Sequence, residues 1–249
     1  DFYNEDLLYQ MFGVNAELLI DHAWGYEPCT IAQIRAYKPQ SSSLGCGQVL
    51  PCPYTADKAR IVVQEMIDGI SLELVEKRLV TDQLVLTIGY DIENLTRPEI
   101  RKVYKGPVTT DRYGRRVPKH AHGTWNLPRV TSSSSELLEA MAALYDKIVN
   151  PALLIRRMSL SACHVVNEKM AKEREQKETF EQLDLFTDYA KKEAKEKEEQ
   201  KKRERERRMQ EALLTIKKKY GKNAVLRGMN FEEGATAKER NGQIGGHQA

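Results

Sequence analysis

Two carboxylates have a spacing that could support phosphoryl-transfer chemistry. Asp91 and Glu93 are separated by one residue at the end of an expected strand, so both side chains would point to the same face. Enzymes that transfer phosphoryl groups gather acidic side chains around divalent ions in this way. A third acidic ligand is not apparent, and polar strand ends are common. We therefore expect no catalytic residue on this chain.

Two histidines could take part in a zinc site. His120 and His122 share one face of an expected strand, and Cys46 and Cys52 could complete a set of four ligands. None of the usual short ligand spacings is present, and histidines beside Lys119 suit phosphate or water equally well. We expect no metal ligand and no cofactor on this chain.

A strongly basic segment lies between Arg101 and Lys119. It has seven basic residues and one acidic residue, so it carries +6, whereas the whole chain carries +3. Its glycines and prolines predict a loop or hairpin rather than a helix. Lys and Arg neutralise phosphates, and Thr and Tyr donate hydrogen bonds to them. The segment therefore favours nucleic acid as a partner, although a solvated basic loop has the same composition.

The composition excludes several classes of protein. The chain has 249 residues, of which 30% are charged, and its mean hydropathy is −0.59. No run approaches the ~20 apolar residues of a membrane span. Four cysteines without CxxC spacing do not make a disulfide scaffold, so we expect a reducing compartment, the cytoplasm.

Hydrophobic periodicity predicts an α+β domain in the middle of the chain. Apolar residues alternate in the expected strands and recur at three- and four-residue spacing in the helices. The expected strands and helices are 42–50 (strand), 55–79 (helix), 83–90 and 120–128 (strands), 132–149 (helix) and 154–165 (strand). This order is β-α-β-β-α-β, with two helices on one face of the sheet. The other face must then meet solvent or a ligand.

The two ends of the chain differ from this domain. Residues 5–24 predict two short helices with a turn at Gly13. Residues 190–220 combine many Lys, Arg and Glu without Gly or Pro, which predicts a solvated helix about 45 Å long. The remainder, 221–249, is rich in glycine, and we expect a flexible tail.

Gln182-Leu183-Asp184-Leu185-Phe186 is the sharpest short motif. Its three large apolar side chains lie in a polar stretch with no local core to join. Isolated anchors of this kind fit small pockets on a partner protein. The pentapeptide resembles the motif with which bacterial proteins bind the sliding clamp, and Gln182, Leu183, Asp184, Leu185 and Phe186 are its expected clamp-binding residues.

Several stretches together resemble the C-terminal half of Y-family translesion DNA polymerases of the DinB/UmuC type, close to Gram-positive versions. Leu7–Gly13 and His22–Pro28 are similar to the end of the thumb domain. Tyr37–Ser43 is similar to the linker and first strand of the little-finger domain. Asp111–Gly123 and Ala235–His247 are similar to further stretches of the family.

The resemblance implies a division of the chain into segments. These are partial thumb helices (1–36), a little-finger DNA-binding domain (37–167), a linker with the clamp motif (168–189), a charged helix (190–220) and a tail (221–249). Palm and fingers, with the Mg²⁺ site of the polymerase, are expected upstream of Asp1. The enzyme activity of this chain by itself stays open.

The resemblance also implies a function. The chain would contact the sugar-phosphate backbone of primer-template DNA. It would also tether a lesion-bypass polymerase to the sliding clamp during DNA repair of the SOS type, and it would act as a monomer. The expected DNA-binding residues are Lys38, Ser42, Ser43, Arg112, Arg115, Arg116, Lys119, Arg156 and Arg157. A stand-alone adaptor that joins clamp and DNA is the alternative, and a nuclease using Asp91 and Glu93 is a more distant one.

Alanine at both Leu185 and Phe186 should abolish binding to the bacterial sliding clamp, because these side chains are the expected anchors. Surface plasmon resonance with immobilised clamp measures the loss. Affinity for DNA should be unchanged in the same variant. Clamp binding that persists in the double variant contradicts the motif.

Overall fold

A computed structural model describes residues 5–27, 29–37, 42–111, 114–178, 189–244 and 247–248 of the chain. The chain divides into two compact units, Asp1–Gln40 and Ser41–Ala249. The second unit contains the sheet together with the later segments, which the sequence analysis treated as separate parts.

The first unit is a set of short helices. They are α1 (Glu5–Phe12), α2 (Asn15–Ala23) and α3 (Ile31–Ala36). Gly13 has φ +57° in the turn between α1 and α2, a conformation that glycine adopts without strain. The two expected helices and their turn are confirmed. Thr30 begins α3 with a capping box, in which its side chain accepts a hydrogen bond from the Gln33 amide.

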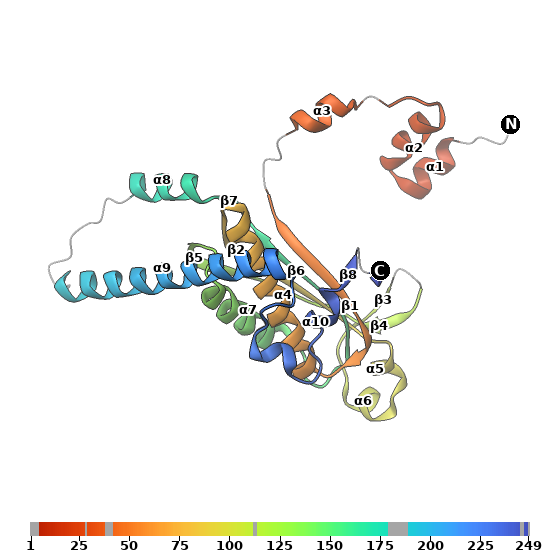
Figure 1. Cartoon of the computed structure of the whole chain (residues 1–249). Coiled ribbons are helices and arrows are strands. Elements are labelled where there is room, and N and C mark those ends of the chain that lie inside the picture. Colours follow the sequence, from red (N-terminus) through yellow and green to blue (C-terminus); the bar gives the residue numbers. More distant parts are fainter. Residues whose placement is uncertain are drawn as a thin grey trace. The chain divides into compact units, whose positions relative to one another are not determined.

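The second unit is built on an antiparallel sheet (Figure 1). Its main elements are β1 (Leu44–Tyr54), α4 (Ala56–Lys77), β2 (Leu79–Tyr90), β5 (Ala121–Thr131), α7 (Ser134–Ile148) and β6 (Ile155–Cys163). The strands are ordered β1-β6-β2-β5, and β7 (Val166–Asn167) pairs with the start of β2. The mixed α+β class and the order β-α-β-β-α-β agree with the sequence analysis.

Alternation along the strands separates the two faces of the sheet. Leu84, Leu86 and Ile88 of β2 are fully buried beneath α4 and α7. Met158 and Leu160 continue this layer on β6, because they pair with Ile88 and Leu86. Each such side chain contributes roughly 1.5–3 kcal/mol on burial. The intervening residues of both strands point away from the helices.

The connection between β2 and β5 contains short elements. They are α5 (Glu93–Thr96), α6 (Pro98–Val103) and the hairpin strands β3 (Val108–Thr110) and β4 (Arg116–Pro118). The expected loop or hairpin in the basic segment is thus confirmed for β3 and β4. The first part of the segment, which includes Arg101 and Lys102, lies in α6 instead. Pro98 begins that helix at a position where its missing N–H costs nothing.

The charged helix is present as α9 (Tyr189–Tyr220), and α8 (Glu168–Glu178) precedes it. The sequence predicted a linker over 168–189, whereas the structure has the helix α8 in the first part of this range. The expectation that α9 is solvated along its length is also wrong. Its second half lies against α4 and the start of α7, and Gln210 is buried there.

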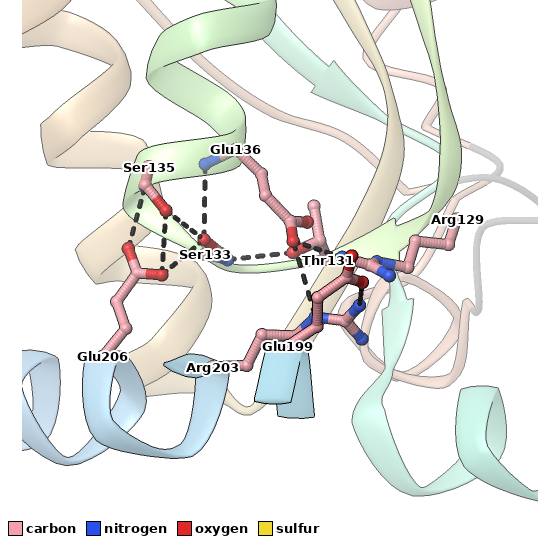
Figure 2. Close-up of polar contacts among 8 residues, drawn as sticks. All are labelled: Arg129, Thr131, Ser133, Ser135, Glu136, Glu199, Arg203 and Glu206. Carbon is pink, nitrogen blue, oxygen red and sulfur yellow. Dashed lines mark hydrogen bonds and ion pairs between the residues drawn. The ribbon is translucent and has the colours of Figure 1, made fainter. Parts of the chain in front are cut away.

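Polar groups make the contact between α9 and α7, as Figure 2 shows. Glu206 accepts hydrogen bonds from the Ser133 hydroxyl at 2.6 Å and from the Ser135 amide at 2.8 Å. A carboxylate at the N-terminus of a helix is stabilised by unpaired amides and the helix dipole. Arg203 lies 3.6 Å from Glu136, which is also bound by Arg129. Polar groups thus make this part of the contact, while Leu213 and Leu214 farther along α9 are half-buried.

The expected flexible tail is folded against α4 over most of its described length. Residues 221–242 include the short 3₁₀ helix η1 (Gly228–Phe231) and α10 (Ala237–Arg240), followed by the paired strands β8 (Gln243–Ile244) and β9 (His247–Gln248). Glu65, buried on α4, holds this segment by accepting hydrogen bonds from Asn230 Nδ2 at 2.7 Å, Thr236 N at 2.8 Å and Ala237 N at 3.0 Å. Glycine content alone predicted mobility and missed this buried acceptor.

Replacing Glu65 with alanine should destabilise the docked segment. The substitution leaves buried amide donors without an acceptor, which costs about 2–3 kcal/mol. Urea denaturation of the full chain measures the loss, and limited proteolysis should cut within residues 221–242. Glu73→Ala is the matched control, since Glu73 is a half-buried residue of α4 whose ion pair with Lys77 is worth about 0.5 kcal/mol or less. Equal stability of the two variants contradicts the role of Glu65.

Candidate nucleic-acid interface

The face of the sheet away from α4 and α7 is uncovered by either helix, and we call it the open face. Strand pairing arranges its side chains in rows across the four strands. Its residues are Gly45, Gly47 and Val49 of β1, Arg157, Ser159, Ser161 and Cys163 of β6, Gln83, Val85, Thr87 and Gly89 of β2, and His122, Thr124 and Asn126 of β5. Most are small or neutral polar residues.

The central row shows how the face is composed. Thr87 lies between Ser159 of β6 and His122 of β5, and Gly47 follows Ser159 on β1. The Thr87 hydroxyl and His122 Nδ1 are 2.9 Å apart, a hydrogen bond across the strands. In the row nearer β7, Gln83 donates to Asn126 Oδ1 at 2.9 Å. These contacts hold polar groups in place while leaving the outer surface available to a ligand.

A depression of about 640 Å³ lies where the open face meets the β3–β4 hairpin, and we call it the hairpin depression. Its lining includes residues from four separate parts of the second unit. Those used below are Thr87, Gly89, Arg115, His120, Arg157 and Ser159. The carboxylates Asp91, Glu93 and Asp111 also line it, and each has a partner within the chain. Three of the expected DNA-binding residues, Arg115, Arg156 and Arg157, line it together.

The three arginines differ in their surroundings. Arg115 binds Asp111 through an ion pair of 2.8 Å, and Arg156 lies 3.9 Å from Asp91. Arg157 is exposed and has no ion pair or side-chain hydrogen bond with the described part of the chain. Its charge is therefore the most available of the three for a phosphate.

The other expected contacts fall into three groups. Arg116 on β4 and Lys119 after β4 are exposed beside the depression. Ser42 and Ser43 precede β1, which places them at the end of the sheet away from Arg157. The Ser42 hydroxyl donates to the Val165 carbonyl at 2.6 Å. Lys38, Arg112 and the clamp motif Gln182–Phe186 lie outside the described residues.

The carboxylates that could have formed a metal site have other partners. Asp91 follows the end of β2, and Glu93 begins α5, so the two do not share a strand face. The Asp91 carboxylate accepts the Glu93 amide at 2.8 Å, and Glu93 binds Arg97. Both residues line the same depression of the second unit, but each carboxylate already has a partner at the turn into α5.

The possible zinc ligands are also separated. Cys46 packs against the core beneath the helices, while His122 lies on the open face. Burial raises the pKa of the Cys46 thiol, which keeps it in the protonated form that binds metals poorly. In the part of the chain that the structure describes, no group of three or more His, Cys, Asp or Glu residues could hold a metal ion.

Most residues of the open face are not among those expected from the sequence. Gln83, Thr87, Ser159 and Ser161 carry no charge, so a search for basic residues overlooks them. The alternation of polar and apolar residues in 83–90 and 155–163 was the available signal, because it shows which residues avoid the core. Their arrangement in rows depends on strand pairing, which the sequence does not show.

The composition of the open face favours contact with a nucleic-acid backbone. None of its residues as defined above is Asp, Glu, Phe, Tyr or Trp. Phosphates are thus not repelled by carboxylates on this face, and bases find no ring on which to stack. Hydroxyl, amide and guanidinium groups donate hydrogen bonds to phosphate oxygens.

No protein-family model matches the chain, and a search of curated proteins finds no match either. None of the helices in the described ranges combines the length and apolar character needed to cross a membrane.

Neutralising the hairpin should weaken binding to duplex DNA of any sequence. Arg115→Gln with Arg116→Gln should reduce the slope of log K against log salt by roughly 0.9 for each phosphate that the variant no longer neutralises. Most of the reduction should come from Arg116, because Arg115 is already paired with Asp111. Fluorescence anisotropy at several salt concentrations measures the slope.

The control changes net charge by the same amount on another surface. Lys201→Gln with Arg205→Gln alters two exposed residues of α9, on the helix side of the unit. An equal reduction in both double variants would indicate an effect of net charge alone, and an unchanged slope would remove the hairpin from the interface.

Proposed function

We propose that this chain is the DNA-binding and clamp-tethering portion of a lesion-bypass DNA polymerase. The observation that carries the proposal is the composition of the open face. This face consists mostly of small and polar residues and contains no carboxylate, and its Arg157 has no ion pair with the described residues. The open face would lie against duplex DNA near the primer terminus, with the β3–β4 hairpin alongside it.

The chemistry of the interface suits a polymerase. An enzyme that moves along a template must hold every sequence equally, so it requires contacts that position the duplex without specifying bases. Contacts to phosphate and sugar have this property, whereas base edges in the grooves carry the sequence information. Serine, threonine and arginine side chains such as those of the open face make contacts of this kind.

The fold is consistent with the resemblance stated above. A β-α-β-β-α-β unit with two helices on one face is the arrangement that a little-finger-like domain would have. On this proposal the parent protein also has a palm domain that binds Mg²⁺. The parent protein acts in the cytoplasm, as a monomer, in SOS-type damage tolerance.

The clamp motif supplies the second half of the proposal. Residues 182–186 follow α8 and precede α9 in the chain, and both helices belong to the same unit as the sheet. A clamp bound there would keep the DNA-binding domain close to the duplex that the clamp encircles. Two weak attachments to one assembly raise the local concentration of each. With the clamp as a tether, a moderate affinity of the sheet for DNA is therefore sufficient.

The open face should prefer duplex DNA to single-stranded DNA. Proteins that bind single strands without sequence preference stack bases on aromatic side chains, which contributes about 1–3 kcal/mol per base. The open face has no Phe, Tyr or Trp, and Trp125 of β5 packs toward the core instead. Anisotropy with a duplex and its separate strands, each in two unrelated sequences, tests this expectation.

Two results would contradict the proposal. One is tighter binding to the single strand than to the duplex. The other is a strong dependence of duplex affinity on sequence, which would indicate base recognition. Equal binding of both duplex sequences, with a steep dependence on salt, is the expected result.

A further inference from the structure

Gly89 and Arg157 are directly paired on the open face, and their side-chain positions overlap in space. A Cβ atom placed on Gly89 would lie 2.3 Å from Cγ, 2.8 Å from Cδ and 3.6 Å from Nε of Arg157. Cβ atoms in proteins essentially never lie closer than 3.0 Å to a non-bonded heavy atom. The space that any other residue would fill at position 89 is occupied by the aliphatic part of Arg157.

These distances define the direction of the arginine side chain. Arg157 belongs to β6, and Gly89 belongs to β2, the next strand in the order β1-β6-β2-β5. Because successive side-chain atoms pass over Gly89, the side chain crosses β2 rather than standing upright from the sheet. Gly89 and Arg157 both line the hairpin depression, together with His120.

The pairing matters because Arg157 is the available cation of the depression. Arg115 and Arg156 have the carboxylate partners described above. Arg157 has none among the described residues, so only its own packing on β2 holds the side chain in place. A free arginine side chain would lose considerable rotamer entropy on binding a phosphate, and packing against the sheet reduces that cost.

We propose that Gly89 is a positioning residue that lets Arg157 lie across β2 and present its guanidinium to a phosphodiester group in the hairpin depression. The inference rests on the proposed function, since it assigns one phosphate contact within the same interface. Gly89 itself touches no phosphate in this arrangement. Any side chain at position 89 would push Arg157 away from the sheet through the clash at Cγ.

The chain supplies a control for the substitution on another surface. Gly69 is an exposed residue of α4 and does not belong to the open face. A Cβ on Gly69 would meet no neighbouring side chain within 4 Å. Gly69→Ala therefore makes the same chemical change without displacing a side chain or altering the open face.

The experiment compares Gly89→Ala, Arg157→Ala, the double variant and Gly69→Ala in the full chain. Salt-dependent binding to a duplex is measured by anisotropy, and thermal unfolding is measured for each variant. Gly89→Ala and Arg157→Ala should each reduce the salt slope by about 0.9, the value for one neutralised phosphate. The double variant should match Arg157→Ala, because the two changes act on the same interaction. Gly69→Ala should bind with the wild-type slope.

The outcomes separate this inference from the proposed function. If the wild-type chain does not bind duplex DNA, the proposed function fails, and the inference fails with it. If the wild type binds and Arg157→Ala reduces the slope while Gly89→Ala keeps the wild-type value, only the inference is overturned. A wild-type slope in Arg157→Ala overturns it as well, since Gly89 then has no phosphate-binding side chain to position.

A folding defect in Gly89→Ala would not remove the test. Adding Gly89→Ala to the Arg157→Ala variant introduces no clash, so this pair should unfold at the same temperature as Arg157→Ala alone. Recovery of folding in the double variant supports the steric coupling. Loss of folding in both variants indicates that the backbone of β2 itself requires glycine, which overturns the inference.

Discussion

The alternation of side chains along four antiparallel strands is the constraint on which the second unit depends. Since neighbouring residues of a strand point to opposite faces, burying Leu84, Leu86 and Ile88 beneath α4 and α7 sends Val85, Thr87 and Gly89 to the other face. The apolar half of the sheet thus determines which residues face outward. Most of those residues are small and neutral, and the one arginine of the open face as defined, Arg157, lies toward the end beside the β3–β4 hairpin.

Basic and acidic residues lie in different parts of the second unit. The formal net charge of +3 is the sum of a basic hairpin and of acidic residues, several of which bind groups of the chain itself. Glu206 of α9 accepts a hydrogen bond from an amide at the start of α7, and Glu65 accepts hydrogen bonds from the C-terminal segment. Asp91 accepts a hydrogen bond from an amide in the turn into α5. These carboxylates compensate the total charge without lying on the open face. Net charge is therefore a weak guide to the partner of a protein whose acidic groups already bind its own amides and hydroxyls.

Polar docking explains where the sequence-based expectations failed. Residues 190–208 lack an apolar stripe, and the tail is rich in glycine, so the sequence predicted a solvated helix and a flexible end. Both segments instead pack against α4 and α7 through buried or half-buried acceptors, which are single residues with specific partners. A lone Glu65 among the apolar residues of α4 was the available signal, because a buried carboxylate requires donors. Its donors lie more than 160 residues away along the chain.

The sequence by itself determined the mixed α+β class, the order of strands and helices, and the basic character of the hairpin. These follow from local periodicity and from turn residues, which act over a few positions of the chain. Only the tertiary structure decided which residues meet across the sheet. The register between β2 and β6 joins Gly89 to Arg157, and the lack of a side chain at one residue then sets the direction of the other. Such a relationship depends on contact between distant segments, and local propensity carries no information about it.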